Sequence, residues 1–216
     1  MKSQLATMLA MQHRMNQRVH PDWIAQEFAW YRALWLECGE LVDHFGYKWW
    51  KKQVPDLEQV RLEVVDIWHF GMSMLLDGRS PDDIAGELLA ALPADIPSMT
   101  VLDAAEALAS RALAERRFDV VCFFSLMHAA GMRFADLYEA YIGKNVLNFF
   151  RQDHGYQDGS YHKIWSGRED NEHLLEILAG LDSRAEDFSN RVYQALAARY
   201  AAIPERRGDA RPVWPR

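Results

Sequence analysis

The chain has 216 residues, half of them hydrophobic, and a formal net charge of −7, with 24 Lys and Arg against 31 Asp and Glu. This composition predicts a globular protein of one domain with a substantial core, and it excludes a disordered chain. The acidic balance disfavours non-specific attraction to nucleic acid or to an anionic membrane surface, so neither is an expected partner.

Two cysteines, Cys38 and Cys122, are too few for a disulfide framework or a zinc site. The first residues lack the apolar block and cleavage site of a signal peptide, and no apolar run reaches the roughly 18 residues that span a membrane. We therefore expect a cytoplasmic protein.

Helical periodicity dominates and predicts an all-α fold. In chain order we expect a first helix at about 3–19, a long second helix from Asp22 to Gly46, a loop at 46–55, and a third helix from Asp56 to about Leu76. Further helices are predicted from Ser80 to before Pro93, at 100–116, at 117–130 and at 134–154.

The last part of the chain begins with a polar, aromatic loop at 155–171. A capping box at 183–186 then predicts a final helix ending near Ile203, and 204–216 is expected to be a flexible tail. No strand pair is predicted. Residues 1–203 are thus expected to form a single all-α domain, with 80–130 as a helical excursion of undefined role.

Two pairs of acids interrupt two apolar helices. Glu37 and Glu40 lie in "ALWLECGELVDHF", and Glu63 and Asp66 lie in "RLEVVDIWHF". Residues three apart share a helix face, and the loop at 46–55 suits an antiparallel hairpin. Each pair lies a similar distance from that loop, so the pairs are expected to face each other.

Four inward carboxylates would raise one another's pKa and destabilise the fold unless a cation joined them. Oxygen ligands select a hard ion, so the pattern favours Mg²⁺, or alternatively Mn²⁺. Two solvated acidic faces are the alternative, which the apolar context and the matched register disfavour.

A second cluster suits phosphate binding. Lys144, Asn148 and Arg151 fall on one helical face, and Tyr156, Lys163 and Asn171 follow in or beside the loop. A helix end with scattered basic residues is an equally weighted alternative.

Motifs for other reactions are absent. The chain has no phosphate loop of the G-x-x-x-x-G-K-[ST] type and no G-x-S-x-G elbow. His69 follows Asp66 by three residues, but the Glu-x-x-His pairs of di-iron bundles are missing. This disfavours a di-metal oxidoreductase and suggests that His69 packs or lines a pocket.

The pattern E-x-x-E, 22 residues, then E-x-x-D resembles the all-α nucleotide pyrophosphatase superfamily. The strings "WLECGELVDHFGYKWWK", "EVVDIWHF" and "YIGKNVLNFFRQDHGYQDGSYHKIWSGREDN" resemble its dimeric dUTPase branch, as does "MLAMQHRMNQ" near the N-terminus. The resemblance covers about 5–76 and 134–180.

This resemblance implies a helical homodimer that hydrolyses dUTP, and also dUDP, to dUMP. It implies Mg²⁺ bound by Glu37, Glu40, Glu63 and Asp66. Gln12 and Asn16 would read the uracil edge, and His69 and Phe70 would line the nucleoside pocket. The phosphates would be held by Lys48, Lys144, Asn148, Arg151, Tyr156, Lys163 and Asn171. We assign catalytic roles to Lys144 and Arg151, and to Glu40 as the general base.

Two other functions stay open at this level. Another branch of the superfamily could act on dCTP or on several nucleotides, because an amide flip of Gln12 or Asn16 would serve either pyrimidine. A non-catalytic helical interaction protein is an alternative of a different class.

Overall fold

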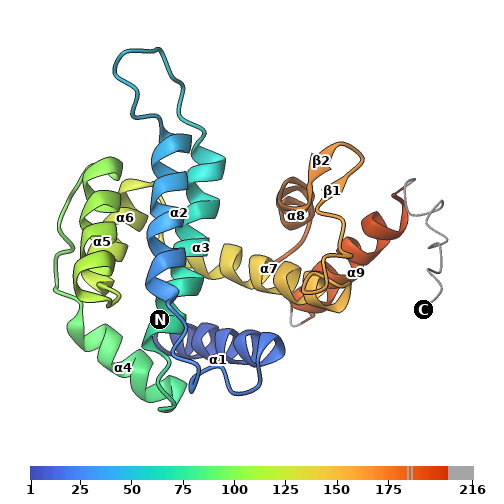
Figure 1. Cartoon of the computed structure of the whole chain (residues 1–216), viewed down its shortest axis with the longest axis horizontal. Helices are drawn as coiled ribbons and strands as arrows, with labels where there is room; N and C mark the ends of the chain where they lie inside the picture. The colour runs from blue at the N-terminus through green and yellow to red at the C-terminus, as the bar shows by residue number, and fades with distance from the viewer. Residues whose placement is uncertain (184, 186, 204–216) are drawn as a thin grey trace, which may run out of the picture. The chain divides into compact units, whose positions relative to one another are not determined.

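The structure is a computed structural model that describes residues 1–183, 185 and 187–203. The described residues are mostly helical, which confirms the all-α class. The helices are α1 (Lys2–Val19), α2 (Trp30–Phe45), α3 (Leu57–Leu75), α4 (Pro81–Ala91), α5 (Val101–Glu115), α6 (Val120–Ala129), α7 (Phe134–Asp153), α8 (Asp170–Ala179) and α9 (Phe188–Ala201), and the strands are β1 (Ile164–Trp165) and β2 (Arg168–Glu169) (Figure 1).

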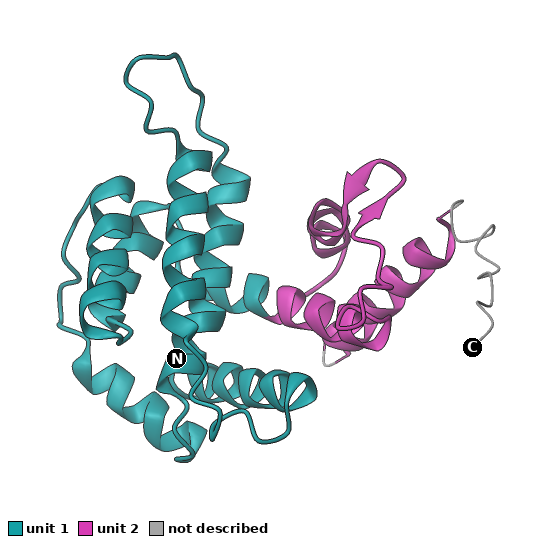
Figure 2. Ribbon diagram, viewed as in Figure 1, with its two compact units in different colours: residues 1–141 teal, residues 142–216 magenta. Residues whose placement is uncertain are grey.

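The chain divides into two compact units, Met1–Tyr141 and Ile142–Arg216, and the boundary falls inside α7 (Figure 2). The sequence-based expectation of a single domain over 1–203 stays a prediction.

Side-chain caps mark the starts of several helices of the first unit. Asp56 caps α3 by accepting from the Gln59 amide, and Ser80 and Thr100 cap α4 and α5 in the same way. Gly46 ends α2 with φ of +89°, a conformation that glycine adopts without strain. The predicted starts of α3, α4 and α5 are therefore confirmed.

The predicted start of the second helix is wrong. Residues 21–27 form turns, and α2 begins only at Trp30. Glu27 has φ of +49°, which a right-handed helix does not allow. The Trp23 and Phe28 rings each pack edge-on against Trp30, so aromatic contacts hold this segment in its bent path.

Helices α2 and α3 form the expected antiparallel hairpin, and the loop at 46–55 projects from its end (Figure 1). The segment 80–130 belongs to the same unit, because α5 packs on α2, and α6 packs on α5 and α3. Its aromatic residues complete the core: the Trp68 ring stacks on Phe123 at 4.8 Å between centroids, and both are fully buried.

The second unit contains a two-stranded hairpin that the sequence did not predict. Strand β1 pairs antiparallel with β2, with Trp165 opposite Arg168. Ser166 and Gly167 both have positive φ, as the tight turn of a two-residue hairpin requires. Helix α8 was not predicted either, since 155–171 reads as loop and no cap marks its start.

Helix α9 begins at Phe188, close to the predicted last helix. The capping box at 183–186 includes two positions outside the described residues, and so does the whole predicted tail at 204–216. No single helix among the described residues has the length and apolar character to span a membrane, although α6 and α7 together pass that test as a bent pair.

Candidate active site

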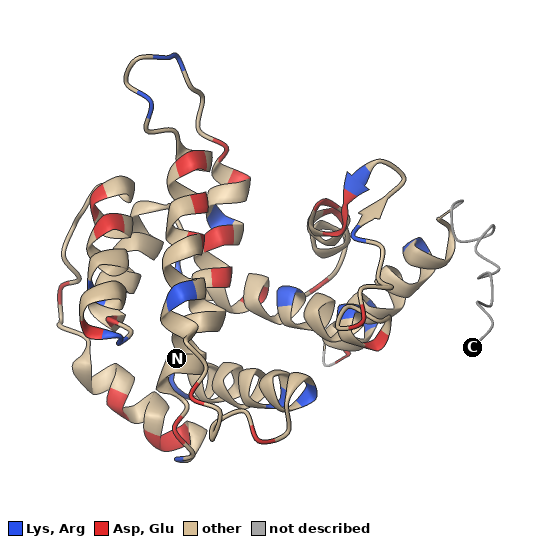
Figure 3. Ribbon diagram, in the orientation of Figure 1, with Lys and Arg blue, Asp and Glu red and all other residues tan. Residues whose placement is uncertain are grey.

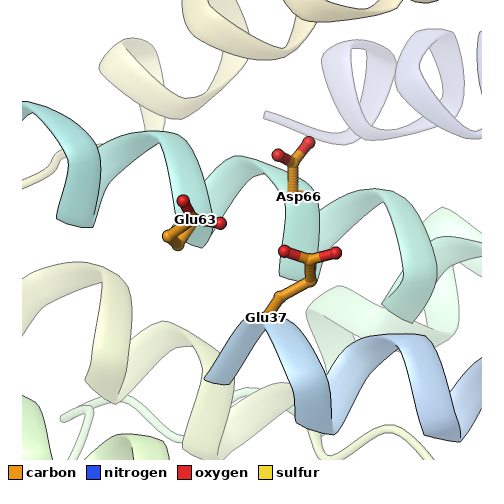
Figure 4. Close-up of side chains that lie close together, drawn as sticks. All are labelled: Glu37, Glu63 and Asp66. Carbon is orange, nitrogen blue, oxygen red and sulfur yellow. The ribbon is translucent and has the colours of Figure 1, made fainter. Parts of the chain in front are cut away.

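Three acids meet between α2 and α3. Glu37 comes from α2, and Glu63 and Asp66 come from α3, one helical turn apart (Figure 4). One carboxylate oxygen from each lies within 4.8 Å of the other two. Glu63 is buried, and the other two are partly buried. Oxygen donors at this spacing suit a hard divalent cation.

The environment penalises negative charge on these groups. Burial, and then the nearby carboxylates of Asp66, Glu63 and Glu40, raise the pKa of Glu37 to about 9. His44 approaches the cluster, with its Nε2 atom 3.6 Å from a Glu63 oxygen. Figure 3 shows acidic positions along both helices of the hairpin. A cation between the helices would offset this repulsion.

The structure leaves two of the predicted residues outside the cluster. Glu40 is exposed and is absent from the set of three, although its charge acts on Glu37. Lys48 lies in the loop at 46–55, where its ammonium binds the Asp43 carboxylate at 2.9 Å. Their assigned roles stay predictions.

A buried polar network lies further along α3, against α1. The Gln12 Nε2 atom donates to Asn16 Oδ1 at 2.9 Å and to Ser73 Oγ at 3.1 Å. Its Oε1 atom lies 2.7 Å from His69 Nδ1 and 3.2 Å from the Tyr141 hydroxyl, whose single hydrogen is shared with the Met8 carbonyl oxygen at 3.0 Å. The structure therefore brings together Gln12, Asn16 and His69, which the sequence suggested for the nucleoside. It adds Ser73 and Tyr141 to this group.

A cavity of about 710 Å³ lies beside this network, in the first unit. Ser73 is one of its lining residues, and Trp30 is another. The Trp30 ring stacks on Phe70 at 6.2 Å, so Phe70 supports one wall. The remaining lining residues are Trp23, Ile24, Glu27, Phe28, Ala29, Tyr31, Arg32, Met74, Leu76, Asp77 and Arg116.

The predicted phosphate-binding residues of α7 gather in the second unit. Lys144 is buried and donates to Asn171 Oδ1 at 3.0 Å. Arg151 donates to Asn148 Oδ1 at 3.2 Å, and its guanidinium lies over the Tyr156 ring at 5.7 Å. The sequence placed these five side chains in one group, and the structure brings them together.

Arg151 is held by a carboxylate that the sequence did not single out. Its Nε and Nη2 atoms each donate to an Asp170 oxygen at 2.8 Å, and the Tyr161 hydroxyl donates to the same carboxylate at 2.7 Å. Burial by itself would raise the pKa of Asp170, but the Arg151 and Tyr161 hydrogen bonds outweigh it and lower that pKa. The pair is therefore ionised at neutral pH.

Lys163 differs from the rest of this group. It is exposed, and its ammonium binds the Glu169 carboxylate at 3.2 Å. A pair so exposed contributes little to stability.

Sequence reasoning missed four residues of these clusters, and two had a usable signal. Ser73 follows Asp66 by seven residues, on the same face of α3, and Asp170 directly precedes Asn171. Tyr141 and Tyr161 had no distinguishing pattern, since each occurs in a segment rich in aromatic residues.

The fold and the acid cluster define an all-α protein whose helical hairpin carries a carboxylate site suited to a divalent cation. The model of a family described as dUTPase matches residues 4–156. This is more than half of the chain, and the chain therefore belongs to the all-α dUTPase family. Comparison with curated proteins gives no significant match.

Membership confirms the enzymatic interpretation. The chain is a dUTP diphosphatase, a hydrolase of nucleotide metabolism whose substrate is a nucleotide, in a family that generally uses a divalent metal. The matched range contains the acid cluster, the polar network and Lys144 to Tyr156, whereas Lys163, Asp170 and Asn171 lie beyond it.

Proposed function

We propose that the enzyme hydrolyses dUTP, and also dUDP, to dUMP with Mg²⁺ at the acid cluster. The observation that carries this proposal is the convergence of Glu37, Glu63 and Asp66 between the two central helices of a dUTPase-family chain. A cluster of solvated surface acids would not contain a carboxylate as buried as Glu63.

The donor set fits Mg²⁺. All three groups offer carboxylate oxygens, and no thiolate or imidazole belongs to this cluster within the described residues. When bound, the ion would screen the phosphate charges and lower the pKa of a water molecule. Mn²⁺ has similar oxygen preferences and is the expected substitute.

The attacking water must lose a proton to the protein. Glu40 is our candidate for this general base, because it shares the helix face of Glu37 yet stays outside the cluster of three. A carboxylate that is not occupied as a ligand can accept a proton. Alternatively, Glu40 is a fourth ligand of the metal ion. Both roles require that the Glu40 side chain turn toward the cluster.

The nucleoside is assigned to the network and cavity of the first unit. Asn16 and Gln12 supply amides for the pyrimidine edge, and Phe70 supplies an apolar surface for deoxyribose. A ribose 2′-hydroxyl on that surface would lose its hydrogen bonds to water, which disfavours UTP.

The phosphate chain is assigned to the basic group of α7 and the segment after it. Lys144 and Arg151 are held in place by Asn171 and Asp170, and such preorganised cations stabilise charge on a leaving pyrophosphate. Asn148 and Tyr156 flank Arg151. We also assign Lys163 and Lys48 the role of adding positive charge. If the two inner phosphates are bound most tightly, dUDP is also a substrate.

We further infer a homodimer. The loop at 46–55 carries exposed apolar residues: Trp49 is 90% exposed, Trp50 60% and Val54 80%. Apolar side chains in such a position favour burial against another surface, and a second copy of the chain is the partner that the dimeric branch of the family implies.

Both cysteines are free, which fits a reducing cytoplasm.

Metal-dependent stability tests the central part of this proposal. Mg²⁺ should raise the melting temperature of the wild-type chain, because a ligand of the native state shifts the unfolding equilibrium. Glu63→Gln should remove most of that rise, whereas Glu58→Gln, on the first turn of the same helix and outside the cluster, should keep it. Identical melting curves with and without Mg²⁺ or Mn²⁺ would rule out the metal site.

A further inference from the structure

The hydrogen bonds of Ser73 fix the orientation of the two amides in the polar network. Its hydroxyl carries one hydrogen and donates it to the His69 carbonyl oxygen at 3.0 Å, which can only accept. Ser73 Oγ must therefore accept from its other two neighbours, Gln12 Nε2 at 3.1 Å and Asn16 Nδ2 at 3.0 Å.

This requirement orients both amides. With the nitrogens turned to Ser73, the Gln12 oxygen faces His69 Nδ1 at 2.7 Å, so that ring nitrogen carries the hydrogen. A flipped Gln12 would set its oxygen against Asn16 Oδ1, two acceptors with no hydrogen between them. The buried serine thus removes the ambiguity that an amide alone would have.

The two amides differ in how many of their hydrogen-bonding groups are used inside the network. Gln12 uses both of its N–H groups and its oxygen inside the network. Among the described residues, the Asn16 side chain makes two hydrogen bonds, one through its nitrogen and one through its oxygen. Asn16 can therefore make further bonds to a ligand, with a polarity that Ser73 and Gln12 have set.

A side-chain amide held in one orientation can discriminate between two pyrimidines of equal size. Uracil presents a carbonyl oxygen where cytosine presents an amino group, so one orientation of a reading amide suits only one of them. Ser73 also lines the 710 Å³ cavity and stands seven residues beyond Asp66 on α3. That spacing is about 10.5 Å along the helix, comparable with the length of a nucleoside.

We propose that Ser73 is a specificity-determining positioning residue, which makes the enzyme choose uracil over cytosine by holding the Gln12 and Asn16 amides in one orientation. The proposal rests on the proposed function, since it assumes that the Asn16 amide, whose orientation Gln12 and Ser73 set, meets the base.

The test compares kcat/KM for dUTP and dCTP, at equal Mg²⁺, in the full chain and three variants. Ser73→Ala removes the shared acceptor, so the preference for dUTP should fall by about tenfold or more. Ser73→Thr restores the hydroxyl and should restore the preference. Ser125→Ala is the matched control. Ser125 is equally buried and makes the same bond to a carbonyl four residues back, but it bonds to no side-chain amide of the described residues.

Each outcome decides the question. A folded Ser73→Ala enzyme that keeps the wild-type ratio, or a ratio that Ser125→Ala changes equally, overturns the inference alone. If Ser73→Ala does not fold, Ser73→Cys gives the decision, since sulfur fills the space but accepts hydrogen bonds weakly and should lower the ratio. A wild-type chain inactive on dUTP overturns the proposed function, and this inference with it.

Discussion

Asp170→Asn tests the buried ion pair that holds Arg151. The wild-type pair has two 2.8 Å hydrogen bonds, with the Asp170 side chain 0% exposed and that of Arg151 11% exposed. Removing one partner of such a pair typically costs about 3–5 kcal/mol of stability. Asn keeps one accepting oxygen, so we expect a value near the lower limit, about 3 kcal/mol.

The same change should reduce catalysis. Arg151 would lose the fixed orientation of its guanidinium, and loss of one preorganised charge contact typically lowers kcat by about 10²-fold. Urea unfolding would give the stability and steady-state kinetics the rate. Glu169→Gln is the control, because the neighbouring Lys163–Glu169 pair is exposed and should contribute no more than about 1 kcal/mol.

The sign of the pH dependence adds a further check. Because the folded-state pKa of Asp170 is lowered, the pair stabilises the enzyme above the unfolded pKa of about 3.9, and this contribution is lost as the pH falls through the lower folded value. The difference between wild type and Asp170→Asn should thus be constant from about pH 5 to 8 and shrink in stronger acid. An Asp170→Asn enzyme as stable and active as Glu169→Gln would refute the reasoning.

Two predictions concern the first unit. The pKa of Glu37 is raised from 4.5 to about 9, so the folded metal-free chain binds an extra proton in this interval, and its stability should fall as pH rises from 4.5 to 9. Glu37→Gln should flatten that slope in urea titrations, and an unchanged slope would contradict the assigned pKa. Gly71→Ala should cost about 1–3 kcal/mol, since its new carbon would lie 2.5 Å from the Phe118 ring. Gly39→Ala should gain about 0.5–1 kcal/mol, because its new carbon would meet no described atom within 4 Å beyond its own stretch of helix. Equal melting temperatures for the two variants would refute this contrast.

The hairpin and its acids could be predicted because each signal is local. Asp56 and Gly46 mark the ends of α3 and α2, and spacing by three places Glu63 and Asp66 on one face. The position of Glu40 shows the limit of that reasoning. Spacing gives the face of a helix but not the position of each carboxylate, and Glu40 is exposed and absent from the cluster that Glu37 joins.

The misses have a common cause in contacts between distant residues. The bend before α2 depends on Trp23 and Phe28 packing on Trp30, and helical capping signals around Asp22 do not report it. Asp170 reads as one charge among several in "GREDN", and only its contact with Arg151, on another helix, reveals its role. Because of that contact, Arg151→Ala should destabilise the fold as well as slow catalysis, since it leaves the buried Asp170 carboxylate without its cation.

Product analysis on a nucleotide panel is the most direct measurement of the central claim. With Mg²⁺ and equal concentrations of dUTP, dUDP, dCTP, dTTP and UTP, the account predicts dUMP from the first two, with release of pyrophosphate and phosphate respectively. It predicts little turnover of the others, and no turnover of any nucleotide by Glu63→Gln. Equal rates on dCTP and dUTP would contradict the proposed specificity, and full activity without a divalent cation would contradict the role given to the acid cluster.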